Sequence, residues 1–111
     1  MPADVSLAGV SALDANSIVL KGVLNFDTVP GLMKQVELLI KQSTEASVDF
    51  SEVEKTNSAG LALLLEIVRF MQLRNANVQF KNVPEQIAIV ARAYGIDTAL
   101  DSAEFARQAT A

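Results

Sequence analysis

The distribution of apolar and polar residues predicts a β-hairpin at the start of the chain. Residues 5–13 alternate mildly between apolar and polar, and residues 18–24 form a β-branched run that is typical of a strand. Residues 14–17, between them, are rich in Asp, Asn and Ser, which favour tight turns. We therefore expect two antiparallel strands over residues 5–24.

Helical spacing begins after residue 28. Pro30 suits the first turn of a helix, and the apolar residues beyond it recur at intervals of about one turn. They form one stripe, made of Leu32, Val36, Leu39 and Ile40. Lys34, Glu37 and Lys41 fall on the other side of this helix, so it is expected to pack a single face against a sheet.

The rest of the chain alternates between short strands and helices. We expect strands over residues 46–50 and 78–83, a polar loop over 51–57, and a long helix over 58–74 that the asparagines at 75 and 77 end. A third helix opens at Pro84 and ends near Gly95, and a short helix follows over 101–107. The predicted stripe of the third helix contains Ile87, Val90, Ala91 and Tyr94.

This order, ββαβαβα(α), predicts an α/β fold with a small mixed sheet and helices mainly on one face. The chain has 111 residues, which suits one domain, so we expect a single domain over residues 1–111.

The long helix is more apolar than a surface helix requires. Apolar side chains fill about 220° of its circumference, whereas packing on a sheet uses a stripe only somewhat wider than about 100°. Either the neighbouring helices cover the surplus, or it is a docking face for a partner. In the second case Phe70 and Met71 are suitable anchors, because they are large and apolar.

Composition argues against an enzyme. The chain contains no Cys and no His, which excludes thiol nucleophiles, disulfides and a Ser-His-Asp triad. Its net charge of −4 and its lack of Trp disfavour nucleic acid as a partner. The carboxylates Asp49, Glu52 and Glu54 are interpreted as solvated or capping residues. We predict no catalytic residue, cofactor or metal, and a cytoplasmic protein without a membrane span.

The most informative stretch is Asn57-Ser58-Ala59-Gly60, where a loop turns into the long helix. Asn57 is a candidate N-cap, and Gly60 relieves crowding or lets another segment approach closely. Ser58 then lies on the first turn, where the helix dipole favours negative charge. These residues either cap the helix and nothing more, or form part of a functional surface.

The segments Val48-Asp49-Phe50-Ser51-Glu52-Val53 and Asn57-Ser58-Ala59-Gly60-Leu61-Ala62-Leu63-Leu64 resemble the signature of STAS domains. The downstream segments Asn82-Val83-Pro84 and Tyr94-Gly95-Ile96 also fit that family, so the resemblance covers about residues 5–107. It implies the fold of bacterial anti-sigma factor antagonists. In the antagonists the phosphorylated residue directly precedes the Gly, where this chain has Ala59.

The run of leucines after Gly60 resembles one branch in particular, the MlaB-like STAS subunit of the ABC transporter that maintains outer-membrane lipid asymmetry. This resemblance implies a non-catalytic subunit that docks on the cytoplasmic ATPase and supports its assembly and activity. It implies a peripheral location at the inner membrane through that partner. The implied partner-binding residues are Asn57, Ser58, Ala59, Gly60, Leu61 and Leu65.

The alternative is an anti-sigma factor antagonist in a partner-switching pathway. Ser58 would then be phosphorylated in place of the hydroxyl that Ala59 lacks.

Overall fold

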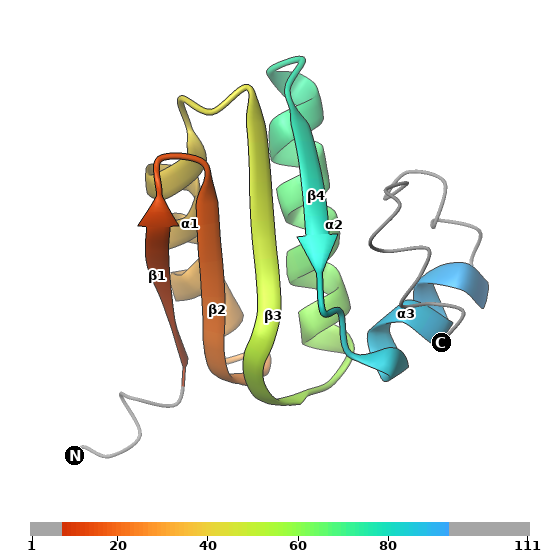
Figure 1. The fold of residues 1–111 in the computed structure, drawn as a ribbon. Helices are drawn as coiled ribbons and strands as arrows, with labels where there is room; N and C mark the ends of the chain where they lie inside the picture. Colours follow the sequence, from red (N-terminus) through yellow and green to blue (C-terminus); the bar gives the residue numbers. More distant parts are fainter. Residues whose placement is uncertain (1–7, 94–111) are drawn as a thin grey trace.

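A four-stranded mixed sheet forms the framework of the protein (Figure 1). The structure, a computed structural model, describes residues 8–93. Its elements follow the order β1 (Ala8–Asp14), β2 (Ser17–Leu24), α1 (Val29–Ile40), β3 (Glu45–Thr56), α2 (Ser58–Leu73), β4 (Asn77–Lys81) and α3 (Glu85–Ala93). This agrees with the predicted order up to the third helix; Gly95 and residues 101–107 lie outside the described part.

The strands lie side by side in the order β1-β2-β3-β4. The β1–β2 hairpin is antiparallel, and β2, β3 and β4 are mutually parallel. Parallel neighbours need crossover connections, which α1 and α2 supply on the same face of the sheet (Figure 1). The prediction of a mixed sheet with helices mainly on one face is therefore confirmed.

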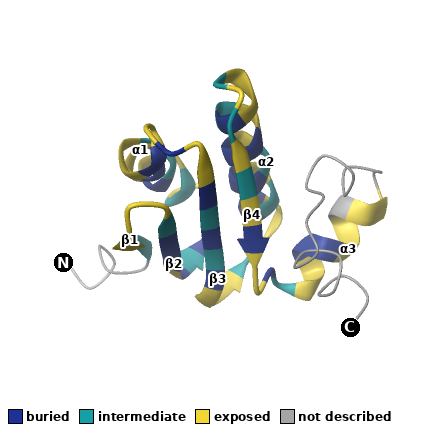
Figure 2. Ribbon diagram, turned by 45° about the horizontal axis from the view of Figure 1, so that its top comes forward, coloured by how far each residue is buried: buried dark blue, intermediate teal, exposed yellow. Residues whose placement is uncertain are grey.

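The core lies between the sheet and these two helices (Figure 2). In β3, as far as Phe50, residues that point toward the helices alternate with exposed or half-buried ones, as the two-residue period of a strand requires. In β2, Val19 between Ile18 and Leu20 is buried as well. Phe50 and Phe80 meet in the centre with their ring centroids 6.1 Å apart. The helical side of the core consists of Leu32, Val36, Ile40, Leu63, Leu64, Ile67, Val68 and Met71.

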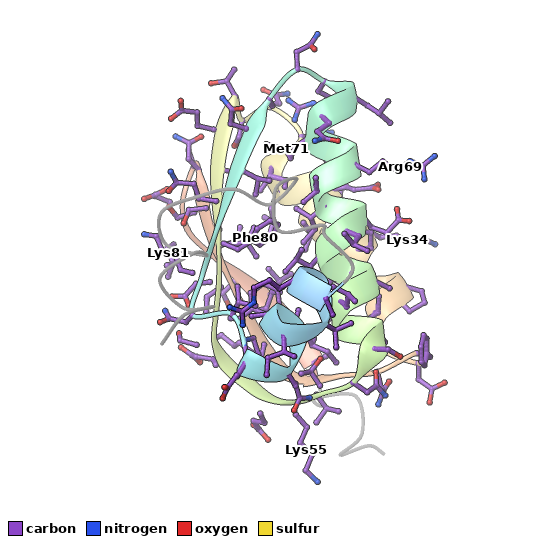
Figure 3. The ribbon with its side chains drawn as sticks, turned by 90° about the vertical axis from the view of Figure 1, so that its right-hand side faces the viewer. Lys34, Lys55, Arg69, Met71, Phe80 and Lys81 are labelled. Carbon is purple, nitrogen blue, oxygen red and sulfur yellow. The ribbon has the colours of Figure 1, made fainter. Side chains whose placement is uncertain are left out.

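Most of the surplus apolar surface of α2 is used inside the domain. Met71 is fully buried, so the prediction that it anchors a partner is wrong (Figure 3). Phe70 is half-buried and packs against the core. Leu61 and Leu65, near the start of α2, are also half-buried, and they keep part of their surface exposed.

The largest differences from the predicted strands are at the ends of β3 and β4. β3 continues through the predicted loop to Thr56, because its polar second half pairs with the end of β2: Val23 lies opposite Lys55, and Leu24 opposite Thr56. Two register shifts accompany this pairing. β4 ends at Lys81 rather than at residue 83, since Asn82 adopts a left-handed conformation with φ of 56°.

The predicted stripe of α3 is only partly buried. Ile87 is buried as expected, with Ala88 beside it, but Val90 keeps 38% of its surface exposed. The side chains of Ala91 and Tyr94 lie outside the described part. The exposed side of α3 therefore adds apolar surface next to the start of α2.

Arg74, at the end of α2, connects this helix to the end of α1 through hydrogen bonds. Its guanidinium donates hydrogen bonds to the backbone oxygens of Ile40 at 3.4 Å and Ser43 at 3.2 Å, and lies 5.4 Å above the centre of the Phe70 ring. The carbonyls at the end of α1 lack partners within their own helix, so a cation is favourable there.

We expect Arg74→Ala to lower the free energy of unfolding by about 1–3 kcal/mol, since hydrogen bonds from a charged donor are lost. Arg74→Lys should lose less, because it keeps the charge but not the planar fork. Urea denaturation measures both. Arg69→Ala is the control, because Arg69 points away from the sheet into solvent (Figure 3). An equal effect of Arg74→Ala and Arg69→Ala would contradict this assignment.

Candidate functional site

The start of α2 forms as its sequence predicts. Asn57 has extended backbone angles, φ −136° and ψ −157°, and its side-chain oxygen accepts a hydrogen bond from the Ala59 N–H at 2.7 Å. This is the geometry of an N-cap, which satisfies one of the amides that a helix leaves free at its first turn. The predicted capping role of Asn57 is confirmed.

The candidate site residues divide into exposed and buried members. Asn57 and Ser58 are exposed, and Leu61 and Leu65 are half-buried. Ala59 and Gly60 have lost nearly all their surface to the interior. Any contribution of the last two to partner binding is therefore indirect, through the shape and position of the helix start.

Gly60 lies directly against the end of β3. A Cβ atom at this position would overlap the Thr56 hydroxyl oxygen, and would lie 3.0 Å from Ile87 Cδ1. The absence of a side chain thus allows the first turn of α2 to pack between β3 and α3. The predicted role of Gly60 in relieving crowding is confirmed.

A shallow hollow of about 150 Å³ lies between the start of α2 and α3. Its lining is uncharged and consists of Asn57, Ser58, Leu61, Gln86, Ile87 and Val90. The Gln86 side-chain amide donates a hydrogen bond to the Thr56 carbonyl at 2.6 Å, which ties α3 to the end of β3. Sequence reasoning missed Gln86, because its partner is 30 residues away and no local motif marks the contact.

The turn between β2 and α1 lies at the same end of the sheet. The Asn25 side-chain oxygen accepts hydrogen bonds from the N–H groups of Asp27 at 2.8 Å and Thr28 at 2.9 Å. Asn25 is thus a turn residue, because its side chain bonds to backbone amides two and three residues further along. Because Leu24 pairs with Thr56, this turn and the start of α2 leave the sheet from neighbouring strand ends.

Asp49 serves a structural purpose on the face of the sheet away from α1 and α2. Its carboxylate accepts hydrogen bonds from the Asn82 side chain at 2.9 Å and the Ser51 N–H at 2.8 Å. Burial works to raise the pKa of Asp49, but these hydrogen bonds and the nearby charge of Lys81 outweigh it, so the pKa falls below its ordinary value. Glu52 and Glu54 are exposed.

Because the pKa of Asp49 is lowered, the free energy of unfolding depends on pH. The folded chain holds the Asp49 proton more weakly than the unfolded chain does, so the charged form stabilises the fold above the unfolded-state pKa of about 4. That contribution disappears as the pH falls through the lower, folded-state pKa. Asp49→Asn should therefore be less stable than the wild type near pH 7, and the difference should shrink toward pH 3.

Urea denaturation at several pH values measures this difference, with Glu54→Gln as a control that removes an exposed carboxylate from the same strand. A stability difference between Asp49→Asn and the wild type that stays constant from pH 7 to pH 3 would contradict the linkage.

Within residues 8–93, acidic side chains do not gather in groups of three or more that could hold a metal ion. Over the same part of the chain, no helix is long and apolar enough to cross a membrane.

Comparison with known proteins identifies the fold and the family. The family model described as MlaB, STAS domain, matches residues 5–102. The anti-sigma factor antagonist SpoIIAA in its unphosphorylated form has a similar structure, with a TM-score of 0.63 and 16% sequence identity over 93% of this chain and 95% of that chain. For the Bacillus cell fate determinant SpoIIAA in the phosphorylated form, the TM-score is 0.64 at 16% identity, over 94% of this chain and 99% of that chain. No curated protein matches the sequence. The predicted STAS-like fold is confirmed.

Proposed function

This chain belongs to the MlaB-like STAS domain family, and we propose that it is a non-catalytic accessory subunit of an ABC transporter for phospholipid. It docks on the cytoplasmic ATPase of that transporter and supports its assembly and activity, in the service of outer-membrane lipid asymmetry. STAS domains typically act as regulators or accessory subunits and mediate protein–protein interactions. The protein is then cytoplasmic and lies at the inner membrane through its partner.

The observation that carries this proposal is the exposed Ser58 hydroxyl beside the uncharged hollow between α2 and α3. A partner can accept one hydrogen bond from Ser58 while apolar side chains of Leu61 and Val90 exclude water around it. Leu65, one turn beyond Leu61, extends the apolar strip along the helix. Such a surface binds without a change of charge, which suits a permanent subunit.

The position before Gly60 supports the same choice. In the antagonists this position carries the phosphorylated hydroxyl, but here it is Ala59, which has no hydroxyl and is buried. A kinase therefore has no acceptor at the usual place.

One observation favours a second candidate, an anti-sigma factor antagonist that is phosphorylated on Ser58. The Ser58 side chain is exposed at the first position of a helix of 16 residues, where the helix dipole stabilises a phosphate. Incubation with the cognate kinase and ATP would then add about 80 Da to the chain, the mass of one phosphoryl group. Absence of this mass on Ser58 in cells and after incubation with the kinase excludes the second candidate.

The experiment that tests the proposal is purification of the tagged protein from its own host in mild detergent, followed by mass spectrometry. The expected companions are an ABC ATPase, its permease and a lipid-binding subunit. A tagged Ser58→Asp variant serves as the control for specific capture. Recovery of a soluble kinase instead of the ATPase, or phosphate on Ser58, would overturn the proposal in favour of the regulatory candidate.

A further inference from the structure

Phe26 is an aromatic side chain that lies outside the hydrophobic core. It keeps 66% of its surface exposed, whereas Phe50 and Phe80 are buried in the core. Phe26 is followed by Asp27 and lies in the turn between β2 and α1. An exposed phenyl ring exchanges unfavourable contact with water for packing when a partner covers it.

The backbone that carries Phe26 is held in place by hydrogen bonds on both sides of it. The Asn25 side-chain oxygen accepts hydrogen bonds from the N–H groups of Asp27 and Thr28, and the Val29 N–H donates to the Asn25 carbonyl at 3.0 Å. The Thr28 hydroxyl donates to the Val23 carbonyl at 2.9 Å. Because the turn is already ordered, a partner that binds the ring loses little entropy in fixing the backbone.

Phe26 lies at the same end of the sheet as the start of α2. Leu24 and Thr56 are opposite each other at the ends of two parallel strands. Phe26 follows two residues after Leu24, and Ser58 two residues after Thr56. Adjacent strands in a sheet are about 4.8 Å apart, so a single partner surface reaches both turns.

The exposed charges at this end are mainly negative. Asp27 follows Phe26, Glu54 lies near the end of β3, and Glu85 begins α3. Lys55 carries a positive charge at this end, and its side chain points away from the body of the domain into solvent (Figure 3). Electrostatic complementarity therefore favours a partner with basic side chains around its contact.

We propose that Phe26 is a second anchor of the docking surface, and that its occupant is a protein surface with an apolar pocket for the phenyl ring and Lys or Arg side chains at the rim. This inference rests on the proposed function, since it assigns that surface to the ATPase subunit. It enlarges the site from the α2–α3 hollow to a contact that spans the ends of β2 and β3.

The test measures the affinity of the purified chain for the purified ATPase subunit. Phe26→Ala should weaken binding by at least about tenfold, the loss expected for an anchor residue. Leu13→Ala is the matched control: Leu13 is 64% exposed, but it lies beside the β1–β2 turn, at the other end of the sheet. Asn25→Ala keeps the ring and loosens its turn, so it should weaken binding by less than Phe26→Ala.

Raising the salt concentration should also weaken binding of the wild type, because the attraction between the acidic end and a basic partner is screened. Circular dichroism and urea denaturation establish that each variant is folded. If Phe26→Ala binds as tightly as Leu13→Ala while Ser58→Asp does not bind, this inference is wrong and the proposed function stands. If the wild type does not bind the ATPase, the proposed function fails and this inference fails with it.

Discussion

Replacing Ser58 with aspartate is expected to weaken binding to the ATPase by about 100-fold or more, while the isolated domain remains folded. Ser58 is exposed and lies beside an uncharged hollow, whereas the basic side chains proposed for the partner lie at the rim of the contact, so a partner that covers Ser58 must desolvate the new carboxylate without a paired charge. Burying one unpaired charge in an interface costs several kcal/mol, which corresponds to a loss of this size.

The stability of the same variant separates a binding defect from misfolding. Asp at the first turn of α2 interacts favourably with the helix dipole, so its free energy of unfolding should equal that of the wild type or exceed it by up to about 1 kcal/mol. Loss of binding together with unchanged or increased stability is the expected signature. Isothermal titration against the purified ATPase and urea denaturation provide the two measurements.

Two further variants control for charge and for the hydroxyl. Thr44→Asp adds the same charge at an exposed position just before β3, at the opposite end of the sheet, and should bind normally. Ser58→Ala removes only the hydrogen bond and should weaken binding by about tenfold. If Ser58→Asp binds as Thr44→Asp does, the start of α2 is not the docking surface.

The helix start could be predicted from sequence because the forces that set it are local. The side chain of Asn57 bonds to an amide only two residues away, so residue type and order are sufficient to identify the cap. The β1–β2 hairpin was predictable for the same reason, since its turn is short and rich in turn-forming residues.

The parts that escaped prediction depend on contacts between distant segments. The polar residues that end β3 show no strand pattern, and they form a strand only because β2 presents free backbone groups beside them. The excess apolar surface of α2 left open whether neighbouring elements or a partner cover it, and Met71 is covered by the packing of several elements that no single helix pattern reveals. The hydrogen bond from the Gln86 side chain to the Thr56 carbonyl, which holds α3 beside the hollow, could not be predicted for the same reason.

Replacing Gly60 with alanine is expected to lower the free energy of unfolding by about 1–3 kcal/mol, the usual cost of an overpacked core. Helix propensity alone predicts the opposite, because alanine is favoured over glycine in a helix by about 1 kcal/mol. The steric term should win, since the new methyl group would overlap the Thr56 hydroxyl oxygen and lie 3.3 Å from Thr56 Cβ and 3.0 Å from Ile87 Cδ1. To remove this overlap, the end of β3 or α3 must shift, and that shift also deforms the hollow beside Ser58. Binding to the ATPase should therefore weaken with stability.

A second glycine provides the matched control. Gly31 is exposed in α1, and a Cβ there would meet no atom within 4 Å, so Gly31→Ala should stabilise the protein by about 0.5–1 kcal/mol. The substitution is the same at both sites, and only the surroundings reverse its sign. Adding Thr56→Ala removes the overlapping oxygen, so Gly60→Ala should cost less in that background, and a double-mutant cycle by urea denaturation measures the coupling. If Gly60→Ala raises stability as Gly31→Ala does, the close packing of α2 against Thr56 is not a constraint on the site.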